Sequence, residues 1–338
     1  MRLGWIFMFL IALNGRAAVP CSQRPHMLEQ PWIRVNFACL EEVINDQSLG
    51  ALAFTALAVG DDGTLYAARP RTGEVIALTD SDGDDLPDAP ETLVSGLSLP
   101  NALVFSASDG ALYIAGGTNL YRWRDGDLVT LVDELPTEGA FGTGGLTMHG
   151  ERLYVGIGAS CQFCESPDPD RGAVWSFALD GSDRRIEMRG LLQPSDLVFV
   201  ADRLYVIDTV RGMLIAQDGQ EIPFAADSQP TGLAFYPHDT DILTLIQNRL
   251  LVVLSGSSHP VHLKGYQVMS VDPVSGAVES VMPTQPEPGT PQSDFTDEEM
   301  SLRGSGFFPQ RPIDVTVSPE GWVYISITDG RILALRPQ

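Results

Sequence analysis

Chemistry-bearing side chains are concentrated in a few short stretches of this chain, and the densest stretch is acidic. Residues 80–91 read Asp-Ser-Asp-Gly-Asp-Asp-Leu-Pro-Asp-Ala-Pro-Glu. Oxygen ligands fall at positions 1, 3, 5, 7 (main chain), 9 and 12 of a calcium loop, namely Asp80, Asp82, Asp84, Leu86, Asp88 and Glu91. Because clustered carboxylates repel one another, the stretch predicts a bound calcium ion that braces the neighbouring strands. The loop glycine, Gly83, is at position 4 rather than 6, so the turn should differ from an EF-hand, and a solvated acidic hairpin is the alternative.

The four cysteines are the next candidates for chemistry. Cys161 and Cys164 are three residues apart, but Glu165 stands where a c-type haem would need His, and a zinc site would need a second pair in a similar setting. A redox pair of the thioredoxin type opens a helix, whereas this pair follows a predicted strand. We therefore expect a small structural disulfide within the loop, with Cys21–Cys39 as a second bridge. Both suit an oxidising compartment.

The N-terminal residues and the net charge limit where the protein works and what it binds. Arg2 precedes an apolar run, Leu3–Leu13, and small residues follow, so residues 1–18 are predicted to be a secretory signal peptide and the protein to be periplasmic or secreted. No later segment reaches about 18 consecutive apolar residues, which argues against a membrane span. The formal net charge of −23 argues against nucleic acid and fits a neutral small molecule or a divalent cation.

A short apolar phrase recurs six times and predicts the architecture that must position these residues. The copies begin at Ala56, Ala102, Gly145, Asp196, Gly232 and Asp314, at spacings of 46, 43, 51, 36 and 82 residues. In five copies a turn and an aromatic strand follow; the looser fifth copy has Ile242-Leu-Thr-Leu after its turn. Periods of this length that contain only strand and turn signals indicate an all-β fold, a six-bladed β-propeller.

The ends of the chain are predicted to close this ring. The last copy leaves room for only the inner strands of its blade, whereas the strand-like segment Ile33–Cys39 precedes the first copy and is otherwise unassigned. We expect that segment to join the last blade and remove an exposed edge. Residues 19–338 would then form a single propeller domain, with a long loop at 283–310.

Several motifs resemble one enzyme family and occur in the same order. They are the loop that runs from Gly158-Ala-Ser-Cys-Gln-Phe-Cys-Glu to Val174, then Gly190-Leu-Leu-Gln-Pro194, Gly232-Leu-Ala-Phe-Tyr-Pro237, Gly256-Ser257 with Gly265-Tyr266, and Arg311-Pro-Ile-Asp314. They resemble motifs of the pyrroloquinoline quinone (PQQ)-dependent glucose and sorbosone dehydrogenases. The resemblance covers about residues 30–336. It implies an oxidoreductase that oxidises an aldose or a related alcohol or aldehyde, with PQQ as cofactor.

The residues that the resemblance assigns to catalysis are altered here. The family's general base is a His five residues before the Leu that corresponds to Leu146, and Phe141 stands at that place. Leu192 replaces an Arg that contacts the cofactor. Nearby candidates to compensate are His262 and Lys264 for catalysis, and Arg311, Asp314, His259 and Lys264 for the cofactor. Solvent-exposed loop histidines are the alternative reading. His149 and His238 are expected in surface hairpin turns.

Two classes of function therefore stay open. One is the PQQ-dependent sugar dehydrogenase. The other is a non-catalytic propeller that binds a small ligand or a partner protein at the face where the inner strands open, lined by Asn101, Thr143, Asp196, Thr231 and Asp314. A calcium-assisted lactone hydrolase shares the fold class, and Asn101, Asp196 and Asp314 supply part of the ligand ring that it would need.

Overall fold

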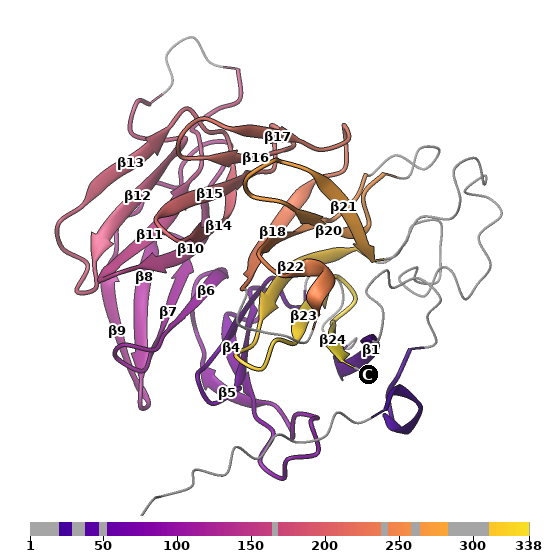
Figure 1. The fold of residues 1–338 in the computed structure, drawn as a ribbon. Coiled ribbons are helices and arrows are strands. Elements are labelled where there is room, and N and C mark those ends of the chain that lie inside the picture. Colours follow the sequence, from indigo (N-terminus) through magenta and orange to yellow (C-terminus); the bar gives the residue numbers. More distant parts are fainter. Residues whose placement is uncertain are drawn as a thin grey trace, which may run out of the picture.

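Six four-stranded antiparallel sheets are arranged around a common centre (Figure 1). The computed structural model describes residues 20–28, 38–46, 53–163, 168–237, 243–257, 264–282 and 311–337. The described part contains only two short 3-10 turns besides strands, Cys21–Gln23 and Thr244–Ile246. No helix in these ranges is long and apolar enough to cross a membrane. The predicted six-bladed β-propeller is confirmed.

Each of the first five blades is a meander of four consecutive strands. Blade one contains β2 (Ala56–Val59), β3 (Leu65–Arg69), β4 (Glu74–Leu78) and β5 (Glu91–Val94). Blade two contains β6 (Pro100–Ser106), β7 (Ala111–Gly116), β8 (Asn119–Arg124) and β9 (Asp127–Val132). Blade three contains β10 (Thr143–His149), β11 (Arg152–Ile157), β12 (Ala173–Ala178) and β13 (Arg185–Arg189).

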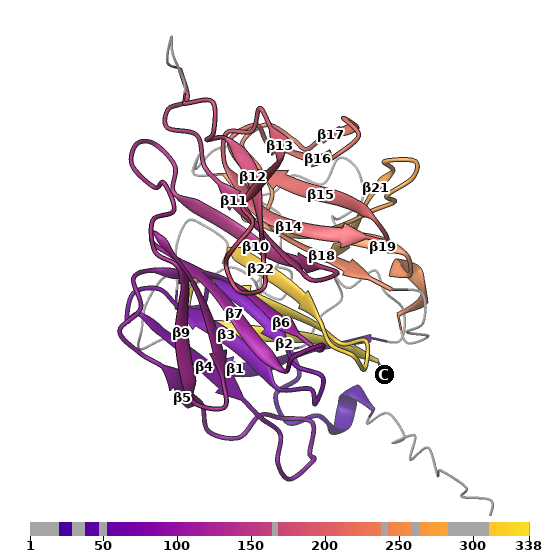
Figure 2. The same cartoon turned by 90° about the vertical axis from the view of Figure 1, so that its left-hand side faces the viewer.

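Blade four contains β14 (Pro194–Val200), β15 (Arg203–Asp208), β16 (Met213–Ala216) and β17 (Glu221–Pro223). Blade five contains β18 (Pro230–Tyr236), β19 (Arg249–Leu254), β20 (Gln267–Val271) and β21 (Val278–Met282). Blade six contains β22 (Pro312–Val317), β23 (Val323–Ile327), β24 (Arg331–Pro337) and, from the other end of the chain, β1 (Ala38–Asn45). The six copies of the apolar phrase lie in β2, β6, β10, β14, β18 and β22, which are the inner strands (Figure 2).

Tight turns and packing between blades explain why the repeated phrase folds in this way. Gly63 and Gly110 follow Asp in hairpin turns and adopt φ of 84° and 64°, a region that favours glycine. The buried apolar residues divide into six clusters, one at each blade-to-blade interface. Each blade therefore buries its two faces against its neighbours rather than in one central core.

In blade five, the expectation of a strand directly after the turn is wrong for Thr244 and Leu245, while Ile242 lies outside the described residues. The second strand of that blade is β19, and Thr244–Ile246 forms a 3-10 turn before it. The run from Leu250 to Leu254 is longer and almost wholly apolar, and it pairs with β18 from Leu254 opposite Pro230 to Arg249 opposite Tyr236. A longer apolar strand buries more surface between two blades, which explains the choice.

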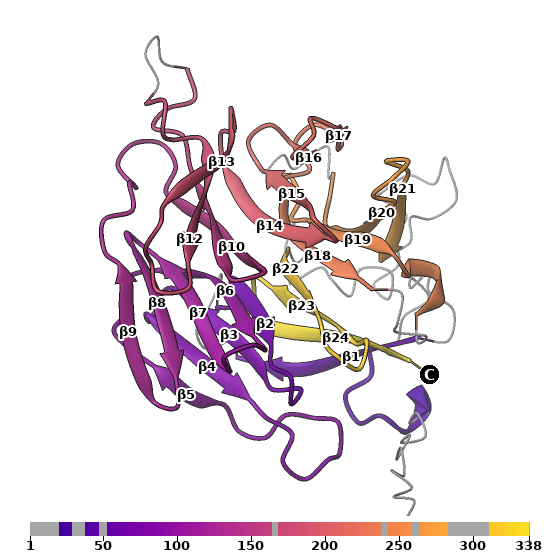
Figure 3. The same ribbon diagram turned by 60° about the vertical axis from the view of Figure 1, so that its left-hand side comes forward.

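The ring closes through the N-terminal strand, as predicted, although the strand lies later in the sequence. β1 pairs antiparallel with β24, with Cys39 opposite Arg336 (Figure 3). The predicted segment overlaps β1 only at Ala38 and Cys39, because residues 29–37 lie outside the described ranges, as do the predicted leader and the loop at 283–310. The predicted disulfide joins Cys21 to Cys39, with 5.5 Å between the Cα atoms.

A buried ionic cluster lies beside this disulfide. The Glu41 carboxylate is fully buried and faces two arginines, Arg24 at 3.2 Å and Arg336 at 3.1 Å. Arg336 also lies over the ring of Trp322, 4.2 Å from its centroid. Arg24 reaches Asp85 at 3.7 Å, which balances the second positive charge of the cluster. The N-terminal segment, blade six and the acidic loop of blade one are thus held together at the point of closure.

Candidate functional site

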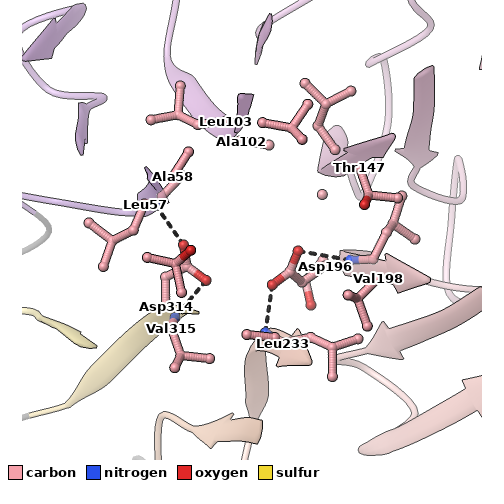
Figure 4. A pocket seen from close by; sticks show the side chains of 18 of the residues that line it. Leu57, Ala58, Ala102, Leu103, Thr147, Asp196, Val198, Leu233, Asp314 and Val315 are labelled. Carbon is pink, nitrogen blue, oxygen red and sulfur yellow. Dashed lines mark hydrogen bonds between the residues drawn. The ribbon is translucent and has the colours of Figure 1, made fainter. Parts of the chain in front are cut away.

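The inner strands enclose a central channel of about 260 Å³ (Figure 4). All six contribute to its wall, mostly with short aliphatic and hydroxyl side chains. The polar residues of the wall are Thr55, Asn101, Thr147, Ser195, Asp196, Thr231, Asp314 and Thr316. Asp196 and Asp314 are the charged residues of this lining, and they extend toward the channel from blades four and six.

Bulges in the inner strands turn these side chains toward the channel. In β14 the register with β15 shifts between Pro194 and Asp196, and in β22 the register with β23 shifts between Pro312 and Val315. A bulge inserts an unpaired residue, bends the strand and re-aims the side chains around it. The Pro that opens each of these strands has no N–H to pair, which suits the bulged end.

Both aspartates connect their own blade to the next one. Asp196 accepts the main-chain N–H of Leu197 at 2.8 Å and of Leu233 in blade five at 2.6 Å. Asp314 accepts the N–H of Val315 at 2.8 Å and of Leu57 in blade one at 2.7 Å. Each carboxyl therefore uses both oxygens to pair main-chain donors, one from its own blade and one from the next.

Glycine in the intervening blades makes room for the two acids. A Cβ on Gly232 would lie 2.7 Å from the Asp314 Cα and 2.9 Å from its Oδ1. A Cβ on Gly145 would lie 2.4 Å from the Asp196 Cα. The order Gly, Asp, Gly, Asp at the start of the repeated phrase in blades three to six is thus a packing requirement as well as a pattern.

The surroundings of the two carboxyl groups favour a proton on the pair. Burial, followed by the negative charge of Asp314, raises the pKa of Asp196 well above its ordinary value. Burial raises the pKa of Asp314 to about 7, against the opposing effect of its main-chain hydrogen bonds. The carboxyls interact with each other, so a proton on one favours the charge on the other. Like-charged groups this close cannot both ionise readily, and the pair titrates as a unit.

Four of the five residues predicted at the opening line the channel: Asn101, Asp196, Thr231 and Asp314. Thr143 instead bridges two blades, donating from Oγ1 to the Gly117 carbonyl at 2.7 Å while its own carbonyl accepts from Asn101. The three members of the expected lactonase ring, Asn101, Asp196 and Asp314, lie in one channel wall.

Two of the basic residues predicted for the site, Arg311 and Lys264, are not among the described residues that line the channel. The Arg311 guanidinium donates to the carbonyls of Gly256 at 2.6 Å and Ser257 at 2.9 Å, and it lies 5.4 Å from the ring centroid of Tyr266. It fastens a loop of blade five to blade six. Lys264 is exposed. His259 and His262 lie outside the described residues.

Phe141 lies beside a buried arginine that the sequence analysis missed. Arg171 donates from Nε to the Gly158 carbonyl at 2.9 Å and from Nη2 to the Phe141 carbonyl. Burial lowers the pKa of this guanidinium. Arg171 therefore holds two loops of blade three together; its position just before the buried strand β12 was the available signal.

His149, expected in a surface turn, ends β10, with its Nε2 3.1 Å from Asp202 and its ring stacked on Phe199 at 4.3 Å. His238 is outside the described residues.

The acidic loop of blade one brings three of its predicted ligands together. Ligand atoms of Asp80, Asp82 and Asp84 lie within 4.8 Å of one another, and all three residues are exposed. Asp88 instead accepts hydrogen bonds from the main chain and hydroxyl of Ser81, which lower its pKa. Glu91 is the first residue of β5 and Leu86 is half-buried in the loop.

In the Cys161 loop, Cys161 is disulfide-bonded, and Cys164 lies outside the described residues.

Comparison with known proteins shows the fold. No family model and no curated protein matches this sequence. The calcium structure of a Trichoderma reesei enzyme of carbohydrate-active family AA12 is 12% identical, with a TM-score of 0.66 over 94% of this chain and 100% of that one. The PQQ domain of pyranose dehydrogenase from Coprinopsis cinerea is 13% identical, with a TM-score of 0.63 over 91% and 98%. A gluconolactonase from Xanthomonas campestris is 15% identical, with a TM-score of 0.63 over 94% and 99%.

Proposed function

We propose that this protein is an exported propeller that binds a small polyhydroxylated molecule, of about monosaccharide size, in its central channel. The observation that carries the proposal is the Asp196–Asp314 pair, which extends into a space of about 260 Å³. Carboxyl oxygens accept hydrogen bonds from sugar hydroxyls, and the surrounding Ala, Val and Leu side chains can contact a sugar ring. The Cys21–Cys39 disulfide and the predicted leader support export.

A channel variant tests this proposal. Thr147 lies in the wall, on β10, with its side chain toward the channel (Figure 4), so Thr147→Met would fill part of the space with a flexible apolar chain. Calorimetric titration of a panel of monosaccharides into the mature protein should show binding that Thr147→Met weakens at least about tenfold. Thr130→Met, the same change on an exposed outer strand, is the control and should bind as the wild type does. Equal affinities in the two variants would place the site elsewhere.

PQQ-dependent oxidation of an aldose is the second candidate, favoured by the fold shared with the pyranose dehydrogenase domain. The described residues do not fit this cofactor, however. PQQ carries three carboxylates, and the described channel wall offers it an acidic pair and no Lys, Arg or His. Titration of PQQ with calcium, followed by quinone absorbance, tests the candidate; micromolar or tighter binding would require basic groups from His259, His262 or Lys264.

We further propose that calcium binds at the acidic loop and has a structural role. Asp80, Asp82 and Asp84 supply three carboxylates within reach of one ion. The loop also contacts the closure of the ring, because Asp85 pairs with Arg24. An ion here would neutralise part of the local negative charge and hold the loop in one shape.

A further inference from the structure

The channel wall has more capacity to accept hydrogen bonds than to donate them. Its amide and two of its hydroxyls already donate to main-chain carbonyls: Asn101 to Thr143 at 2.7 Å, Thr231 to Ile313 at 2.7 Å and Ser195 to Ile207 at 3.4 Å. These donors are not available to a ligand without breaking an existing bond.

Acceptors, by contrast, remain. Each oxygen of Asp196 and Asp314 accepts one main-chain N–H, and a carboxylate oxygen has room for a second hydrogen bond. Because these carboxyl oxygens can pair with further donors, a ligand rich in N–H and O–H groups is favoured over one rich in acceptors.

The charge of the wall points in the same direction. Within the described lining, the inner strands β2, β6, β10 and β18 contribute only uncharged side chains, so the aspartates on β14 and β22 are its titratable groups. A cation placed against them gains from their charge. An anion, such as a sugar acid, meets a negative pair and no positive partner.

We propose that the channel selects a small hydroxylated amine in its protonated form, such as an amino sugar or an amino alcohol, and releases the shared proton of Asp196 and Asp314 when it binds. This proposal rests on the proposed function, since it names the ligand class of the same channel. The balance is simple: an ammonium ion enters, the pair loses its proton to solvent, and no covalent bond changes. Binding is then coupled to pH, because the ammonium and the proton compete for the same two carboxyls.

Calorimetry of the full mature chain tests this selectivity with three probes that share one ring size: glucosamine, glucose and gluconate. At pH 6 the amine is charged and the pair holds its proton. We expect glucosamine to bind at least about tenfold more tightly than glucose, because a charged hydrogen bond replaces a neutral one. Gluconate should bind least. Titration of glucosamine in two buffers with different ionisation enthalpies should count a proton released, and titration of glucose should count none.

Variants and alternative outcomes separate this inference from the proposed function. Asp314→Asn and Asp196→Asn should reduce the preference for glucosamine, whereas the exposed Asp202→Asn should not; folding of each is checked by circular dichroism. Equal binding of glucose and glucosamine without proton release would overturn the inference and leave the proposed function standing. Failure of all three probes to bind would overturn both. The proton count on the wild type decides the matter even if a channel variant does not fold.

Discussion

Asp196 and Asp314 occupy a position that four other blades fill with Ala or Gly, and their chemistry follows from what each carboxyl must bind. Each accepts two main-chain N–H groups with two separate oxygens. An amide is a poorer acceptor at either position, since its NH₂ group would face an N–H donor. A protonated carboxyl keeps a lone pair on each oxygen for these N–H groups, so the neutral member of the pair stays compatible with the fold.

This pair should make the protein less stable as pH rises from about 4 to about 7. In that range the folded state binds more protons than the unfolded chain, because the pKa of the pair is higher in the folded state. The free energy of unfolding therefore falls as pH rises and levels off above the folded-state pKa. The loss should be on the order of 1–3 kcal/mol across the range. Urea unfolding at pH 5 and 7.5 measures it.

The matched variants for this measurement are Asp314→Asn and Asp202→Asn. Asp314→Asn removes one acid of the pair and should reduce the fall in the free energy of unfolding between the two pH values. Asp202 is exposed on blade four, so its variant should follow the wild type. Parallel curves for wild type and Asp314→Asn would show that the pair does not hold a proton in the folded state.

At this scale the sequence predicted which residues face the channel better than how they interact. Asp196 and Asp314 were expected at the opening because the repeat places them at the start of two inner strands. Their interaction with each other depends on bulges and on the angle between blades, which no spacing in the sequence reveals. Arg311 was assigned to a cofactor because of the family resemblance. Its actual bonds to Gly256 and Ser257 could not be foreseen, because they depend on the path of a loop more than fifty residues earlier.

Among the elements, the loop between β4 and β5 is the one whose stability should depend on an ion. Calcium at about 100 times its dissociation constant should stabilise the fold by about 2.7 kcal/mol, which corresponds to a rise of several degrees in Tm. Asp82→Asn removes one proposed ligand and should reduce that rise. Asp127→Asn, at the exposed start of β9, should leave it unchanged. Differential scanning calorimetry with and without calcium gives the answer, and an equal shift for both variants would point to a different binding place.

Strand patterns were predictable because they repeat, whereas the looser blade was not. Five blades have an aromatic residue soon after the turn, and in these the second strand was placed correctly. In blade five the chain inserts a 3-10 turn before β19, so the pattern appeared to begin too early. Regular hairpins can be predicted from local residues. Where the second strand begins after an insertion depends on its pairing with a distant strand, which local residues do not show.

Across the whole molecule, closure depends on a buried carboxylate with two cationic neighbours. Glu41→Gln would leave Arg24 and Arg336 buried without their shared counter-charge, so we expect it to lower the free energy of unfolding by about 3–5 kcal/mol. Glu42→Gln changes the next residue of the same strand, which is only partly buried, and should cost less than about 1 kcal/mol. Equal effects in urea unfolding would mean that the cluster contributes little to closure.

The pairing of β1 with β24 also imposes an order of events on biosynthesis. β1 is made before every other strand of the ring, and its partner is made after all of them. During synthesis the early strand must therefore wait, with an unpaired edge, until the final segment has been made. A chain that stops before β24 has no partner to offer, so an incomplete product keeps a reactive edge and is an easy substrate for quality-control proteases.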